Sequence, residues 1–283
     1  MSAFVRYGAD DAVVSRMPSP SIWNDCPVND FLADPSKGKH LFEDFHNGVV
    51  AGTTLVKGQP NGWTAYAESN DVADCAVQAD DDGILMLATD GTDADVTALS
   101  GGDNVVGAWK LPTAGSASLK GLWFETRIKV NTVTDGDIGI FVGLAQPGEA
   151  KDAGGCMGGD ASSLADVDRI GFAILSGDGD DLIINYNEAA SGTPQTSTGK
   201  ITLTANTYVR VGFKIVTKSQ GTYVQFYADG EYLGADTDID ITGTNANFPS
   251  ATDMDIVLAL TADGGASDGD ALYIDWVRVG KKF

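Results

Sequence analysis

The sequence predicts an all-β fold in which two antiparallel sheets pack face to face as a sandwich. Short segments that alternate between apolar and polar residues recur along the chain, turns rich in glycine and aspartate separate them, and helical spacing is almost absent. Residues 206–234 show this pattern most clearly, because 209–215 alternates at period two. A turn at 218–221 and the dipeptide Asp229-Gly230 then predict a second and a third strand.

The other strands are predicted from the same alternation, and each is bounded by turn residues. They are expected, in chain order, at 40–46, 63–68, 74–79, 83–90, 104–111, 121–130, 137–145, 168–176, 181–187, 200–204, 254–262 and 271–279. Many short strands at this spacing favour one sandwich domain over residues 40–283. The glycine-rich stretch 146–166 is predicted to be a long loop, either functional or mobile.

Residues 1–39 are predicted to form an extended N-terminal arm, because four prolines interrupt the stretch and aromatic residues are dispersed between them. Two interpretations stay open. The arm folds back over the sandwich and covers an edge, or it reaches a neighbouring subunit and becomes ordered on assembly. In the second case the candidate partner-binding residues are Phe4, Tyr7, Ile22, Trp23, Phe31 and Leu32.

Composition excludes several classes of function. The chain has 18 Lys+Arg against 40 Asp+Glu, a formal net charge of -22, so nucleic acid is not expected as a partner. No apolar run approaches the ~20 residues of a membrane helix, and residues 1–20 lack the apolar core of a secretory signal. We therefore expect synthesis in a cytoplasm and no membrane partner. Cys26, Cys75 and Cys156 are expected to be free thiols.

Five motifs occur in an order that resembles a known family. They are GILMLATD, GLWFETRIKV, DRIGFAIL, NTYVRVGFKIV with QFYADGEYLG, and LYIDWVRVG. This order resembles the concanavalin A-like jelly roll of lectins and laminarinases, and its layout is closest to glycoside hydrolase family sixteen. The resemblance covers residues 40–280 and implies a jelly-roll sandwich.

The resemblance also implies where catalytic acids would lie. That hydrolase family carries Glu-x-Asp-x-Glu on one strand, because a retaining glycosidase needs two carboxyl groups ~5 Å apart. The matching strand here places Arg169, Gly171 and Ala173 at those positions. The register shifted by one residue leaves at most one carboxylate, Asp168. Neither register supports this hydrolysis, so we expect a protein that is not an enzyme.

A structural calcium ion is a further implication of the resemblance. In the family an aspartate of the last strand and backbone carbonyls of two earlier segments hold the ion, and the matching positions are Asp275, Gly83 and Asp44. Oxygen ligands of this kind suit calcium. The alternative is that Asp275 pairs with Arg278 or with a backbone amide. No cofactor is expected to be required.

A jelly roll without catalytic acids is left with binding or with a structural role. The first hypothesis is a capsid decoration or cement protein on the outer shell of a tailed bacteriophage, which binds the major capsid protein and neighbouring copies of itself. The absence of a secretion signal, the aromatic residues of the arm and the acidic charge motivate it. The alternative is a carbohydrate-binding module, on a phage fibre or free. Its candidate aromatic residues are Trp109, Trp123, Tyr186, Tyr223 and Tyr227.

Overall fold

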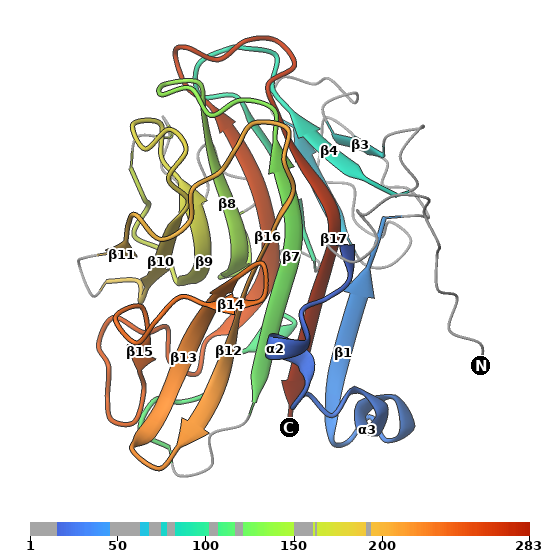
Figure 1. Ribbon diagram of the computed structural model, residues 1–283, viewed down its shortest axis with the longest axis vertical. Coiled ribbons are helices and arrows are strands. Elements are labelled where there is room, and N and C mark those ends of the chain that lie inside the picture. The colour runs from blue at the N-terminus through green and yellow to red at the C-terminus, as the bar shows by residue number, and fades with distance from the viewer. Residues whose placement is uncertain are drawn as a thin grey trace.

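The computed structural model confirms the two-sheet, all-β prediction. It describes residues 16–45, 63–67, 75–77, 83–101, 107–116, 121–149, 161, 163–190 and 194–283. Within these residues two antiparallel sheets stack on each other, and two short helices lie near the N-terminus (Figure 1). None of the described helices has the length and apolar character needed to cross a membrane.

The first sheet, called sheet A, runs in the order β14-β13-β12-β7-β17-β4-β3, with β1 beside β17 and β15 beside β13. Its strands are β1 (Gly38–Glu43), β3 (Cys75–Val77), β4 (Leu85–Ala88), β7 (Leu122–Val130), β12 (Val209–Lys218), β13 (Gly221–Ala228), β14 (Glu231–Tyr232), β15 (Ile239–Asp240) and β17 (Ala271–Lys282). Strand β7 occupies one edge of β17 over most of its length. The opposite edge of β17 is therefore shared, by β4 near its start and by β1 near its end.

The second sheet, called sheet B, runs in the order β11-β10-β9-β8-β16-β5-β2, with β6 beside β16. Its strands are β2 (Thr64–Ala67), β5 (Val96–Ser100), β6 (Trp109–Lys110), β8 (Ile138–Ala145), β9 (Arg169–Ile174), β10 (Ile183–Asn187), β11 (Gln195–Ser197) and β16 (Asp253–Ala262). Strand β9, which matches the catalytic strand of the hydrolases, lies between β8 and β10 near the middle of this sheet.

The hairpin predicted over residues 206–234 is confirmed. Strands β12 and β13 pair up to Lys218 and Gly221, where the chain turns. The next turn is made by Asp229 and Gly230, which have φ angles of 47° and 85°. Glycine accepts such positive φ angles without steric cost, and aspartate tolerates them, so this dipeptide permits the tight turn into β14.

The core between the sheets follows from the alternation of the strands. Phe124 and Phe213 stack with ring centroids 5.0 Å apart on the inner face of sheet A. Phe172 of sheet B meets Phe226 of sheet A edge-on, at 5.8 Å. Side chains alternate along each strand, so every second strand residue faces outward from this core. Since the inner faces pack against each other, a binding site on the sheets would lie on one of the two outer faces.

The structure differs from the sequence prediction at several elements, among them the N-terminal arm, the strand expected at 200–204, and β5, which was not predicted. The N-terminal arm is not extended throughout, because α2 (Pro20–Trp23) and α3 (Val28–Ala33) are helical, and proline at the first position of α2 favours that conformation. The strand expected at 200–204 forms a single bridge through Thr202. Much of the loop expected at 146–166 lies outside the described residues.

Candidate functional site

The outer face of sheet B carries Arg169, Gly171 and Ala173, the residues that the family resemblance matches to the catalytic acids of the hydrolases. Ile170, Phe172 and Ile174 belong to the core between the sheets. Since side chains alternate along a strand, Arg169, Gly171 and Ala173 face outward, and Ala173 belongs to a separate outer cluster. The register predicted from the sequence is therefore the one that the structure has.

This outer face is itself a hydrophobic core. Its buried residues are Val96, Ala98, Phe141, Ala145, Ala161, Ala173, Ile183, Val257 and Ala259. Leu164, Val167 and Leu175, which flank β9 in the sequence, pack against them. The side chains are mostly small, so the segment that covers them, residues 163–167, can approach the sheet closely. This stretch is called the covering segment of sheet B. In the described part of the chain, this face is filled and does not form an open groove.

Arg169, the first residue of β9, contacts the segment that precedes this strand. Its side chain is fully buried, its Nε donates to Asn185 Oδ1, and its Nη1 donates to the backbone carbonyl of Ala165. On the next strand Asn187 Nδ2 donates to Asp166 Oδ1 at 2.9 Å and to the carbonyl of Val167 at 3.1 Å. Arg169 thus holds Ala165 on the sheet, and Asn187 holds Asp166 and Val167 there.

The middle acid position has no room for a side chain. Gly171 lies directly opposite Gly143 of β8. A Cβ atom on Gly171 would lie 2.4 Å from the carbonyl oxygen of Val142 and 2.8 Å from the Cα of Gly143. A carboxylate at residue 171 would therefore require the two strands to move apart.

Asp255 is a buried carboxylate on the same face, but it has a structural environment. It lies on β16, and β8 separates it from β9, because Ala145 pairs with both Asp255 and Arg169. The backbone amide of Ala108 donates to its Oδ1 at 3.1 Å. Two strand spacings put β16 and β9 about 9–10 Å apart. Asp255 therefore does not form, with β9, the close carboxylate pair of a retaining glycosidase.

The outer face of sheet A is covered by the N-terminal segment, defined as residues 16–37. Helix α2 lies over β7 and β12 (Figure 1). Ile22, Trp23 and Phe31 are buried in a cluster with sheet A residues, whereas the Leu32 side chain on α3 is 71% exposed. For these residues the structure has the arm folded back on its own sandwich.

Of the predicted partner-binding residues, Ile22, Trp23 and Phe31 thus contact the chain's own sheet. The two helices turn these side chains inward, which an extended arm would not do. Leu32 makes no such contact with the cluster and is exposed to solvent. Phe4 and Tyr7 lie outside the described residues.

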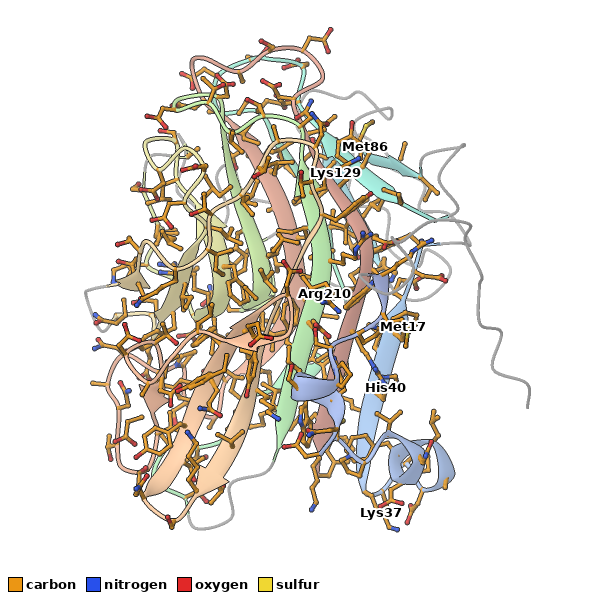
Figure 2. All side chains as sticks on the ribbon, viewed as in Figure 1. Met17, Lys37, His40, Met86, Lys129 and Arg210 are labelled. Carbon is orange, nitrogen blue, oxygen red and sulfur yellow. The ribbon has the colours of Figure 1, made fainter. Side chains whose placement is uncertain are left out.

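Hydrogen bonds hold the N-terminal segment on sheet A. Glu125 of β7 is fully buried and accepts from the backbone amide of Ser19 at 2.9 Å and from Trp23 Nε1 at 2.6 Å. Burial raises the pKa of Glu125, and these donors partly offset that effect. Arg210 Nη1 donates to the carbonyl of Met17 at 2.8 Å, and Figure 2 shows these two residues close together where the segment crosses the sheet.

A shallow pocket of about 530 Å³ lies between the segment and β17. It is lined by Pro20, Trp23, Asn24, Cys26, Pro27, Val28, Asn29, Asp30 and Arg278. Burial raises the pKa of Cys26 to about 12, so its thiol is protonated at neutral pH and is a poor nucleophile. The cysteine of this pocket is therefore unsuited to act as a catalytic nucleophile.

His40 lies beside this pocket, where it is partly buried and contacts Arg278. Arg278 Nε donates to His40 Nε2 at 2.9 Å, and the Arg278 guanidinium stacks 4.1 Å from the Trp23 ring centroid. Burial, together with the positive charge of Arg278, lowers the pKa of His40 to about 4. His40 is therefore neutral at physiological pH and serves as a hydrogen-bond acceptor.

The three predicted calcium positions converge in the strand register. Strand β1 ends opposite Val277 and β4 begins opposite Ile274, so Asp44 and Gly83 approach the same part of β17. Asp275 lies there, at an irregularity in the pairing of β17 with β7. The topology therefore agrees with the family pattern at this site.

The residues around Asp275 do not fit a calcium ion. Asp275 Oδ1 accepts from Arg16 Nη2 at 2.5 Å, and Oδ2 accepts from Arg127 Nη1 at 2.6 Å. Both carboxylate oxygens thus face guanidinium groups, whereas calcium needs six to eight oxygen ligands. Among the described residues, no cluster of three or more His, Cys, Asp or Glu side chains could hold a metal. Asp275 is ion-paired, as the alternative expected, but its partners are Arg16 and Arg127 and not Arg278.

Comparison with known proteins establishes the fold. No protein-family model and no curated protein matches the sequence. An endo-1,3-beta-glucanase from Streptomyces sioyaensis is similar in structure, with a TM-score of 0.56 and 11% identity over 87% of this chain and 97% of that chain. The carbohydrate recognition domain of Emp47p has a TM-score of 0.51 and 12% identity over 87% and 97% of the two chains. A protein of unknown function from Shewanella oneidensis MR-1 has a TM-score of 0.52 and 15% identity over 87% of each chain.

These neighbours confirm the concanavalin A-like sandwich that the motif order indicates. They include hydrolases and a carbohydrate-binding domain with the same fold. At such low identities the likeness extends to the fold alone. The activity of this chain must be argued from its own residues.

We predict that Gly171→Ala destabilises the protein by about 1–3 kcal/mol, because the new methyl group would overlap the neighbouring strand. Gly177→Ala is the matched control, since a Cβ there meets nothing within 4 Å, and we expect a change within about 0.5 kcal/mol. Urea unfolding measures both. Equal stability of the two variants would show that β8 and β9 can separate at no cost.

We predict that His40 makes the protein less stable in mild acid. Its pKa is about 4 when folded, against an ordinary 6.5, so the unfolded chain takes up the proton first as the pH falls from 6.5 towards 4. Stability supplied by neutral His40 is present above pH 6.5 and is lost over this window. His40→Gln keeps an acceptor for Arg278 without titrating. Melting temperatures should fall more steeply with acid in the wild type, and parallel curves would contradict the assignment.

Proposed function

We propose that this protein is a non-enzymatic structural protein that decorates the outer shell of a tailed-phage capsid, where it binds the major capsid protein and neighbouring copies of itself. The observation that carries the non-enzymatic part is the filled outer face of sheet B. Arg169 and Gly171 stand at the positions that the resemblance gives to catalytic acids. Arg169 holds the carbonyl of Ala165, and Gly171 has no room for a side chain. The protein then acts through its outer surface.

The charge of the chain supports a position on the capsid exterior. A formal net charge of -22 disfavours contact with packaged DNA. The expected place of synthesis is the host cytoplasm, where free thiols such as those of Cys26 and Cys75 are stable. Binding to the assembled shell would stabilise it by mass action, since the free energy of binding adds to that of the shell.

The exposed side of the N-terminal segment is the surface that we assign to the partner. Leu32 projects from α3 into solvent, and the pocket of about 530 Å³ extends along the neighbouring residues 26–30. An apolar side chain beside a shallow pocket offers both a projection and a recess to an opposing protein surface. Phe4 and Tyr7, which the sequence also predicts to bind a partner, lie outside the described residues.

A second candidate function is carbohydrate binding, and specific observations favour it. The neighbour Emp47p contains a carbohydrate recognition domain by name. On the outer face of sheet A, Tyr232, which was not among the residues predicted from the sequence, is 40% exposed and packs 5.8 Å from Tyr227, and an exposed tyrosine ring can stack on a sugar. Of the predicted aromatic residues, Trp109, Trp123 and Tyr227 are buried, which weakens the proposal for them.

Quantitative mass spectrometry of purified virions tests the first proposal. We expect the protein in hundreds of copies per particle, and antibody labelling of intact particles should place it outside the shell. Absence of the protein from purified virions would overturn the proposal. A tight and selective hit on a glycan array would instead favour the carbohydrate-binding candidate.

We further predict that Leu32→Asp weakens binding to capsid shells at least tenfold while the melting temperature stays unchanged, because Leu32 is exposed. Thr244→Asp adds the same charge at an exposed loop position and should bind as the wild type does. A sedimentation assay with undecorated shells measures both variants. Equal binding by Leu32→Asp would remove α3 from the interface.

A further inference from the structure

Asp275 is a buried carboxylate whose charge is balanced from within the chain. Its side chain is 0% exposed, and it lies on the last strand of sheet A. Burying a carboxylate is costly unless it is paired and hydrogen-bonded. In the described structure it receives hydrogen bonds from Arg16 and Arg127, whose guanidinium groups together face both of its oxygens.

Arg16 is fixed at this site by its backbone and by its side chain. Its Nε lies 2.9 Å from both Asp275 oxygens, and its Nη2 lies 2.5 Å from Oδ1. Its carbonyl oxygen accepts from Trp276 Nε1 at 2.7 Å. A guanidinium group that donates two hydrogen bonds to one carboxylate is among the stronger hydrogen-bonding arrangements in proteins. The N-terminal segment is therefore tied to β17 at two consecutive residues.

Arg127 approaches the carboxylate from β7. Its guanidinium lies 3.9 Å from the ring centroid of Tyr208, and its Nη1 donates to Asp275 Oδ2 at 2.6 Å. The stacking on Tyr208 and the position on a central strand make this partner part of the rigid sheet. A divalent cation at Asp275 would meet two fixed positive charges, one from each side.

We infer that Arg16 takes the place that the family pattern gives to a metal ion. The N-terminal segment then carries its own counter-ion for Asp275, so the fold does not depend on calcium and the segment is an integral part of sheet A. This inference is independent of the proposed virion role, because it concerns how the chain stabilises itself.

Melting temperatures test the inference in the full-length protein. With wild type, we expect the same value in excess EDTA and in millimolar CaCl₂. Arg16→Ala should lower the melting temperature by roughly 5–10 °C, because it removes one partner of a buried carboxylate. Ethylguanidinium at millimolar concentration should restore part of this loss, and CaCl₂ should not.

Lys200→Ala is the matched control. Lys200 also forms an ion pair with an aspartate, Asp236, but that aspartate side chain is 65% exposed. Exposed pairs contribute little to stability, so we expect a shift of no more than about 1–2 °C and no response to ethylguanidinium. Hydrogen exchange gives a second measure, because Arg16→Ala should speed exchange in residues 19–31 and Lys200→Ala should not.

Two results would overturn the inference. A clear rise in the wild-type melting temperature with CaCl₂, reversed by EDTA, would show that a metal binds despite the arginines. Equal effects of Arg16→Ala and Lys200→Ala would show that Arg16 is not the counter-ion of Asp275. If Arg16→Ala does not fold, Arg16→Lys keeps the charge and loses the paired hydrogen bonds of the guanidinium group, and it should show a smaller loss of the same kind.

Discussion

The structure depends on buried charge on the outer face of sheet A. Glu125 and Asp275 are both fully buried there, on strands β7 and β17, and neither could be removed from water without partners. The N-terminal segment supplies those partners through the amide of Ser19, the indole of Trp23 and the guanidinium of Arg16. Sheet and segment therefore stabilise each other, since without the segment Glu125 would lose the donors Ser19 and Trp23 and Asp275 would keep only Arg127.

The two outer faces are closed by different physical means. On sheet B the residues are small and apolar, and the covering segment packs against them, with Arg169 and Asn187 fixing its backbone. On sheet A the covering segment is held mainly by polar contacts around a small aromatic cluster. The segment that covers sheet B directly precedes β9 in the sequence. The segment that covers sheet A comes from the opposite end of the chain to β17. Helix α2 covers sheet A over β7 and β12, whereas Phe42 on β1 and Tyr232 on β14 are 46% and 40% exposed. A partner could therefore meet the exposed side of the covering segments or these uncovered parts of sheet A.

The sequence predicted the sheets well because alternation is local. The hairpin of β12 and β13 and the outward register of β9 follow from period two, which any half-buried strand displays. Strand β5 was not predicted, because the apolar and polar residues of its sequence, VTALS, do not alternate regularly. Helices α2 and α3 were not predicted, because the prolines around them indicated an extended arm. The pair of Arg16 and Asp275 joins residues 259 apart in the sequence, and no local pattern can indicate such a contact. The glycine at residue 171 showed that an acid is missing, but only its neighbours on β8 show why none fits.

The packing around β9 explains why carboxylates do not fit at residues 169 and 171. An acid at residue 169 would remove the hydrogen bond to the carbonyl of Ala165 and would place a negative charge near that oxygen. An acid at residue 171 would push β9 away from Gly143. Each change acts on the packing of sheet B before it could act on a substrate. In the described structure β8 and β9 therefore pack closely, and side chains bury the outer face around Ala173.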